Sequence, residues 1–139
     1  MEQVLLFRLG THPYALEVSH IQEIVEAPPL YFIPGAPAVY PGAMNFHGNV
    51  VPVLDLGAFL QLDGGEEEQR VLVLSPPLCP LGLLVAGVRR IVNRDPAEQR
   101  PYRETGEKEL FIRFRFELEG EEINMLDIGQ LIARLETAA

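Results

Sequence analysis

The sequence predicts a mostly β protein made of two small five-stranded β-barrels that pack side by side, with short helices after Asp55 and Asp127. Three observations predict this class: short apolar runs between turn residues, a pattern that repeats along the chain, and alternation of apolar and charged residues in its later part. At 139 residues and 47% hydrophobic, the chain is the size of one globular domain with a real core. Twelve prolines and twelve glycines are scattered between the apolar runs, which is typical of short strands joined by turns.

The chain repeats itself. Residues 4–26 align with residues 71–93 at an offset of 67 without a gap, and seven aligned positions are identical. Residues 53–60 (VLDLGAFL) align with residues 125–132 (MLDIGQLI) at an offset of 72. A five-residue insertion between the two blocks reconciles the offsets. Self-similarity on this scale defines an architecture, so we interpret the chain as a duplicated unit of about 70 residues.

The repeat divides a single domain of residues 1–139 into a unit of residues 4–62 and a unit of residues 71–136. Each unit opens with two strands around a proline turn, continues with a short apolar segment and ends with two more strands. Five short strands suit a small closed barrel that hides its sheet edges, so each unit is expected to form one subdomain. The expected segments are 4–9, 14–18, 21–25, 37–46 and 49–54 in the first unit, and 71–74, 81–86, 88–92, 110–118 and 121–126 in the second.

Some strands carry local signals of their place in the sheet. Residues 111–120 (FIRFRFELEG) alternate apolar and charged side chains and end at a glycine, which is typical of a half-buried strand. Pro52 stands within the apolar strand 49–54, and because proline lacks a backbone N–H, we expect an edge position or a bulge there. Asn45 and Gly48 are expected turn residues, because both tolerate positive φ and mark hairpins.

Asp55 and Asp127 occupy matching positions of the two units, each directly before a helical pattern. Aspartate is a favoured N-cap, because its carboxylate accepts a hydrogen bond from a free backbone N–H of the first turn. Gln130 follows Asp127 by three residues, which is the spacing of a capping box. A helix cap must recur in both units, whereas a catalytic aspartate need not recur when no other polar residue of a site is repeated. The sequence therefore favours two helix caps over a catalytic role.

Composition excludes several classes of partner. The formal charge of −9 repels phosphate backbones and anionic lipid, so neither nucleic acid nor direct membrane insertion is expected. Residues 71–88 are uncharged and long enough to span a membrane, but three prolines in the middle favour two buried strands. Cys79 has no partner for a disulfide, and with no signal peptide the chain is expected to be cytoplasmic. The three histidines lack metal-ligand spacing, so neither a metal site nor a cofactor is expected.

These features together resemble the CheW-like domain, the adaptor family of bacterial chemosensory arrays. The family pattern, roughly aliphatic-Asn-Leu-Arg-Gly, three residues, and Pro-Val-aliphatic-Asp-Leu-Arg, appears here as residues 44–48 (MNFHG) and 52–57 (PVLDLG). Residues 5–26 match the family's opening strand pair, residues 33–37 with Gly42 match its Ile-Pro-x-x-Pro and glycine, and residues 125–127 match its C-terminal signal. The resemblance covers nearly the whole chain.

The resemblance implies two five-stranded SH3-like barrels and a non-enzymatic adaptor that couples chemoreceptors to the histidine kinase CheA. It further implies a barrel-to-barrel contact with the regulatory domain of the kinase, and docking of the receptor's helical tip at the groove between the barrels. The family positions that matter for these contacts correspond here to Ile21, Glu23, Gly42, Asn45 and His47. We also expect apolar strand surface to take part, with Ile21 and Val39 as candidates.

The chain departs from the family pattern at two positions, where His47 and Gly57 stand in place of arginines. The family arginine at the first position can pair with the glutamate that Glu23 matches. Histidine is shorter, is not always charged and offers no bidentate fork. We therefore expect His47 to lie near Glu23 across the groove between the barrels and to tune docking, in an adaptor of a divergent system such as those that control type IV pili.

Two other functions remain open at this point. A small enzyme or ligand-binding barrel would use His47 with Glu23 and Asn45, and it would need a deep pocket that converges on His47. A histidine in a turn is also often just solvated. A detached regulatory domain of a kinase is the third interpretation; the start at Met1 and the lack of kinase motifs make a free-standing adaptor simpler.

Overall fold

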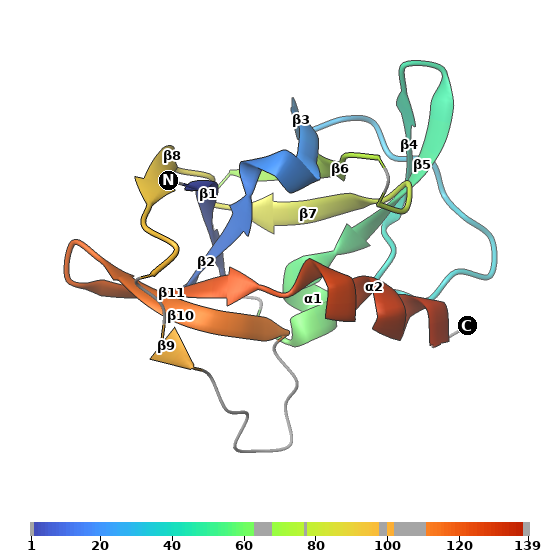
Figure 1. The fold of residues 1–139 in the computed structure, drawn as a ribbon. Helices are drawn as coiled ribbons and strands as arrows, with labels where there is room; N and C mark the ends of the chain where they lie inside the picture. Colours follow the sequence, from blue (N-terminus) through green and yellow to red (C-terminus); the bar gives the residue numbers. More distant parts are fainter. Residues whose placement is uncertain (1, 63–67, 77, 98–99, 102–110, 138–139) are drawn as a thin grey trace.

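The computed structural model describes residues 2–62, 68–76, 78–97, 100–101 and 111–137. The elements follow a similar order along both halves of the chain (Figure 1). The first half contains β1 (Glu2–Leu9), β2 (His12–Glu17), the 3-10 turn η1 (Val18–His20), β3 (Ile21–Glu26), β4 (Gly42–Phe46), β5 (Asn49–Asp55) and α1 (Leu56–Leu60). The second half contains β6 (Gln69–Leu74), β7 (Gly82–Ala86), β8 (Ile91–Arg94), β9 (Arg100–Pro101), β10 (Ile112–Leu118), β11 (Glu121–Leu126) and α2 (Ile128–Thr137).

The first barrel consists of five strands that pair in the order β4, β5, β7, β6 and β3. Its interior is lined by Met44, Phe46, Val51, Val53, Val71 and Val73. Because side chains alternate along a strand, Val71 and Val73 of β6 point into this barrel, whereas the intervening Leu72 belongs to a different cluster.

The second barrel consists of β8, β1, β2, β11 and β10, with the two-residue strand β9 paired to β10. Its interior is lined by Val4, Leu6, Ala15, Val92, Phe114, Phe116, Ile123 and Met125. A pairing of Arg8 with Ala86 connects β1 to β7, and thereby joins the two barrels. The predicted mostly β architecture of two barrels with two short helices is confirmed.

A third cluster fills the space between the barrels. It contains side chains from the strand faces that point away from the barrel interiors and from the buried sides of both helices. Its buried members are Leu5, Phe7, Leu9, Tyr14, Leu16, Leu54, Leu56, Leu60, Leu62, Leu72, Leu74, Leu81, Leu83, Val85, Phe111, Ile112, Leu126, Ile128 and Leu131. Leucine dominates this central cluster, while valine and aromatic residues are prominent in the barrel interiors. The two barrels therefore share one central core.

The barrels do not coincide with the two sequence units. Strands β1 and β2 belong to the unit of residues 4–62 but complete the second barrel, and β6 and β7 belong to the unit of residues 71–136 but complete the first. The expectation of one subdomain per unit is corrected in this respect. Strand pairing depends on residues far apart in the sequence, and the matching strands of the two units have similar patterns. The local pattern therefore could not show which barrel each strand completes.

Some expected strands are shorter than the apolar pattern indicated. The expected strand of residues 37–46 begins only at Gly42, because Pro37 and Pro41 lack an N–H, and the N–H of Tyr40 donates instead to the carbonyl of Pro37 at 3.0 Å in a tight turn. Residues 88–90 precede β8, although the N–H of Arg89 donates to the carbonyl of Leu6 at 2.9 Å. Residue 110 of the expected strand 110–118 lies outside the described residues.

The predicted helix caps and the position of Pro52 are confirmed. Oδ1 of Asp55 accepts a hydrogen bond from the N–H of Ala58 at 3.1 Å, and Oδ1 of Asp127 accepts one from the N–H of Gln130 at 3.0 Å. Pro52 pairs with Ala43 on β4 and lies before the part of β5 that pairs with β7, so this part of the strand has a described neighbour on one side only. Within the part of the chain that the structure describes, no helix is long and apolar enough to cross a membrane.

Candidate docking surface

The β4–β5 hairpin ends in a two-residue turn at His47 and Gly48. Both residues have positive φ, 51° and 86°, which is the combination that lets a two-residue hairpin follow the twist of its strands. Oδ1 of Asn45 accepts a hydrogen bond from the N–H of Gly48 at 2.9 Å and so holds the turn closed. Asn45 itself lies in β4, so the expectation that Asn45 adopts the turn conformation is corrected: His47 does.

The imidazole of His47 reaches across to β3. Its Nε2 lies 3.2 Å from Oε1 of Glu23, and its ring meets the ring of Phe46 edge-on at a centroid distance of 4.4 Å. Both partners are open to solvent, with 69% of the His47 side chain and 48% of the Glu23 side chain exposed. The expected proximity of His47 and Glu23 is therefore confirmed. However, β3 and the hairpin belong to the same first barrel, so the pair spans that barrel's end and not the groove between barrels.

The other two predicted site residues are not fully exposed. Gly42 is buried at the start of β4, and a Cβ placed there would lie 2.7 Å from the carbonyl oxygen of Tyr31. This close approach allows Tyr31 and Ala43 to exchange two backbone hydrogen bonds of 2.8 Å each, which tie the segment before β4 to the hairpin. Ile21 is half-buried at the start of β3 and packs against the central cluster, as does Val39. Ile21 and Val39 therefore each bury part of their side chain in the protein and leave only the remainder for a partner.

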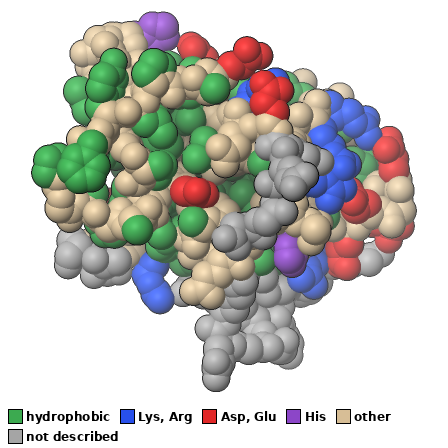
Figure 2. Space-filling model, turned by 180° about the vertical axis from the view of Figure 1, so that it is seen from behind, with side chains coloured by type: hydrophobic (Ala, Val, Ile, Leu, Met, Phe, Trp, Pro, Cys, Tyr) green, Lys and Arg blue, Asp and Glu red, His purple; other side chains and the backbone are tan. Residues whose placement is uncertain are grey.

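Sequence reasoning missed the most exposed apolar side chains. Tyr31, Phe32 and Val50 are 62%, 83% and 78% exposed. Val50 pairs with Asn45 across the hairpin, and Tyr31 lies next to β4 through its bridge to Ala43. Figure 2 shows hydrophobic side chains gathered over this side of the molecule, around the β4–β5 hairpin. The signal was present in the sequence: Val50 breaks the alternation of β5, and Tyr31 and Phe32 stand in a proline-rich segment that forms no strand.

Among the residues that the structure describes, the polar neighbours of His47 are exposed and do not enclose a catalytic pocket. The imidazole is too exposed to be shielded from water, and Glu23 and Asn45 lie at the surface with it. Burial raises the pKa of the Cys79 thiol, and the nearby Glu136 carboxylate adds to this shift, so the reactive thiolate form is disfavoured. Among the described residues, no three His, Cys, Asp or Glu side chains gather as they would to hold a metal ion.

An exposed polar turn beside large exposed apolar side chains is typical of a surface that another protein covers. The sequence profile of the CheW-like domain matches residues 3–136, and the chain belongs to this family. CheW proteins are scaffolds and adaptors and not enzymes.

Several curated relatives carry the CheW name. The chain is 28% identical over 92 residues to the probable chemotaxis protein CheW of Rhizobium etli, which is 65% of this chain and 59% of that protein. It is 28% identical over 101 residues to chemotaxis protein CheW of Rhizobium meliloti, covering 71% and 65% of the two proteins. It is 28% identical over 102 residues to chemotaxis protein CheW of Klebsiella aerogenes, covering 72% and 61%. The chain thus spans less than two thirds of the length of each of these relatives.

The fold is also found in solved structures. The scaffolding protein TtCheW from Thermoanaerobacter tengcongensis superposes with a TM-score of 0.81 over 89% of this chain and 82% of that chain, at 20% sequence identity. Its fold consists of two SH3-like β-barrels, as found here.

Proposed function

We propose that this chain is a non-enzymatic, cytoplasmic adaptor that couples chemoreceptors to a CheA-type histidine kinase, in chemotaxis or in pilus-based motility. Membership of the CheW-like family supports the adaptor role, and the names of the curated relatives support chemotaxis. The observation that carries the proposal is the end of the first barrel, where an exposed ion pair lies on the same barrel as unburied aromatic and aliphatic side chains.

The proposed partner-binding residues divide into two kinds. Glu23, Asn45 and His47 are exposed, so their side chains are available to the regulatory domain of the kinase or to the receptor tip. Gly42 and Ile21 act through the backbone and packing: Gly42 permits the close approach of the segment at Tyr31, and Ile21 anchors the start of β3 on the central cluster. Exposed Phe32 and Val50 add the apolar area that a charge pair alone does not supply.

A reconstitution tests this proposal. The purified chain is mixed with the histidine kinase and chemoreceptor fragments of the same organism, and kinase autophosphorylation is measured with and without the chain. We expect the receptor to change kinase activity only when the chain is present, and we expect the chain to co-sediment with both. Receptor control of the kinase that is equal with and without the chain, together with absent co-sedimentation, would overturn the proposal.

A further inference from the structure

A histidine takes the place of a permanent cation at the end of the first barrel. Residues 9–69, which include β3, β4 and β5, contain no Lys or Arg. Strand β6 brings Arg70 to the same barrel, but its guanidinium lies 3.7 Å from Glu26 at the last residue of β3. Among the residues that the structure describes, His47 is the one basic side chain within ion-pair distance of Glu23.

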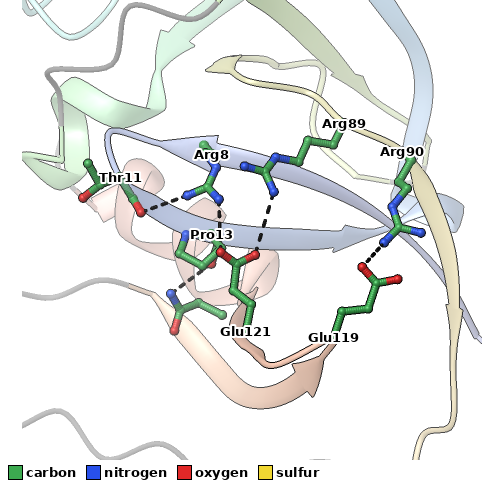
Figure 3. A network of polar contacts seen from close by, with 8 residues as sticks. Arg8, Thr11, Pro13, Arg89, Arg90, Glu119 and Glu121 are labelled. Atoms are coloured by element: carbon green, nitrogen blue, oxygen red, sulfur yellow. Dashed lines mark hydrogen bonds and ion pairs between the residues drawn. The ribbon is translucent and has the colours of Figure 1, made fainter.

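The corresponding pair at the end of the second barrel differs in this respect. Glu119 and Gly120 form the turn of the β10–β11 hairpin with φ of 51° and 81°, close to the 51° and 86° of His47 and Gly48. Oε2 of Glu119 lies 2.8 Å from Nη2 of Arg90 (Figure 3). Because arginine stays charged, this pair has no net charge at neutral pH, whereas the pair in the first barrel has none only while the imidazole holds a proton.

The imidazole is held in place by contacts that do not depend on its charge. Positive φ fixes the backbone at His47, and the hydrogen bond from the N–H of Gly48 to Oδ1 of Asn45 closes the turn. The buried ring of Phe46 meets the imidazole edge-on at a centroid distance of 4.4 Å. These contacts are available in both protonation states, and they direct Nε2 towards Oε1 of Glu23 at 3.2 Å.

One proton changes the net charge of this pair. With a neutral imidazole, the pair carries the negative charge of the carboxylate, and with an imidazolium it carries no net charge. In the free chain the difference has little effect on the energy, because 69% of the His47 side chain and 48% of the Glu23 side chain are exposed. Water then solvates the carboxylate in either state.

A partner that covers the pair removes this water. Val50 is 78% exposed and lies across from Asn45 in the same hairpin, so a partner that packs on Val50 reaches the turn. A carboxylate without water needs a positive charge beside it, since a buried charge without a partner is costly. Covering by itself also disfavours an imidazolium, but at 3.2 Å the attraction to Glu23 strengthens as the local dielectric falls. The covered pair therefore binds a proton more tightly than the exposed pair does.

We propose that docking of the kinase regulatory domain on the end of the first barrel is coupled to uptake of a proton at His47, so that the affinity falls as the pH rises from about 6 to about 8. Coupling between two binding events is reciprocal, so the proton strengthens docking by the factor by which docking strengthens proton binding. This regulation rests on the proposed adaptor function and acts at the same surface.

The other charged groups on the elements around the turn have described partners of their own. Glu26 of β3 lies 3.7 Å from Arg70 of β6, and Asp55 at the end of β5 caps α1. In the 3-10 turn before β3, Nε2 of His20 lies 3.9 Å from Oε2 of Glu17. Strand β4 (GAMNF) contains no charged residue. Substitution of the individual histidines therefore shows which imidazole takes up the proton.

Calorimetry in two buffers measures the proton directly. The unaltered chain is titrated with the purified regulatory domain of the organism's histidine kinase at about pH 7, in phosphate and in Tris, which differ strongly in their heats of ionisation. The difference in binding heat between the buffers gives the number of protons taken up, and we expect up to about one per complex. We also expect the affinity to be about tenfold lower at pH 8 than at pH 6.

Two substitutions assign the proton to this pair. His47→Arg supplies a permanent charge, so binding should take up no proton and should have the same affinity at both pH values. Glu23→Gln removes the carboxylate that needs the charge, so the uptake should also be lost. His12→Gln and His20→Gln are the matched controls and should retain the uptake of the unaltered chain. Equal melting temperatures verify that each variant folds.

The possible results separate the proton coupling from the adaptor function. Equal affinity at both pH values without proton uptake, in a chain that binds the kinase domain, would overturn the coupling and leave the adaptor function standing. Uptake that persists in His47→Arg would assign the proton to another group and overturn the coupling as well. Absence of binding at both pH values, together with absent co-sedimentation with kinase and receptor, would overturn the adaptor function and the coupling with it.

Discussion

The interior of the first barrel is lined by four valines, a methionine and a phenylalanine, whereas the second barrel holds two phenylalanines stacked against a buried arginine. The guanidinium of Arg94 lies 4.7 Å and 5.0 Å from the ring centroids of Phe114 and Phe116 and is ion-paired with Glu2. The turns and helix caps of the two halves are nevertheless the same. The halves share their backbone features, while the side chains inside the barrels and at their ends differ, so partner choice is expected to lie in the side chains.

The largest expected effect tests the core that the two barrels share. Leu16 and Leu83 are repeat counterparts, and both lie in the central cluster at 1% and 0% exposure. Because each truncation leaves a cavity in the same core, Leu16→Ala and Leu83→Ala should each lower the free energy of unfolding by about 2–5 kcal/mol. Urea unfolding measures both. A cost below about 1 kcal/mol for one of them would show that the halves do not share this core equally.

A smaller loss of stability is expected at a position where the interiors of the two barrels differ. Gly82 and Ala15 are repeat counterparts, but a Cβ at Gly82 would lie 2.7 Å from Cγ1 of Val71. Gly82→Ala should therefore lower the free energy of unfolding by about 1–3 kcal/mol, although removing a strand glycine usually helps. In a double-mutant cycle with Val71→Ala, the combined loss should be smaller than the sum. A stabilised Gly82→Ala variant would contradict the tight packing of the first barrel.

The helix caps are the feature for which the two halves should respond alike. Asp55→Ala and Asp127→Ala each remove a carboxylate that accepts from the first turn of a helix, at 3.1 Å and 3.0 Å. Each substitution should lower the free energy of unfolding by about 1 kcal/mol. Asp→Asn at each position is the matched control and should retain most of the stability, since asparagine also caps. Equal stability of the alanine and asparagine variants would refute the capping role.

The smallest effect concerns pH. Burial raises the pKa of Glu17 from its ordinary value of 4.5, and the neighbouring Glu2 carboxylate adds to this shift, while His20 and Arg113 oppose it. A raised folded-state pKa means that this contribution to stability is present below pH 4.5 and is lost as the pH rises through the folded-state pKa. The melting temperature of Glu17→Gln should therefore rise relative to the unaltered chain over that range. A relative fall would mean that the contacts of Glu17 with Arg113 and His20 dominate.

The strands and the helix caps were predictable because short local patterns in the sequence indicate them. The proximity of His47 and Glu23 was predictable from the matching positions in the family. The exchange of strands between barrels was not, because β1 and β6 have similar patterns and only long-range packing decides which barrel each completes. The burial of Arg94 and the exposure of Phe32 also run against residue type, since arginine is rarely buried and phenylalanine rarely exposed. That the two halves arose from one repeated unit stays a prediction, which the recurring turns and caps support.

Of the two partners proposed for the end of the first barrel, we propose the regulatory domain of the kinase as the one that contacts the His47 turn, and an exchange of the two turn residues tests this directly. His47→Glu places the second barrel's turn residue in the first barrel, and Glu119→His does the reverse at an equally exposed turn. Binding to the regulatory domain of the organism's histidine kinase is measured by calorimetry at low micromolar concentrations. We predict that His47→Glu weakens binding about tenfold, since the introduced carboxylate would repel Glu23 rather than pair with it, while Glu119→His leaves the affinity unchanged. Unchanged affinity for His47→Glu, or an equal loss for both variants, would contradict the account.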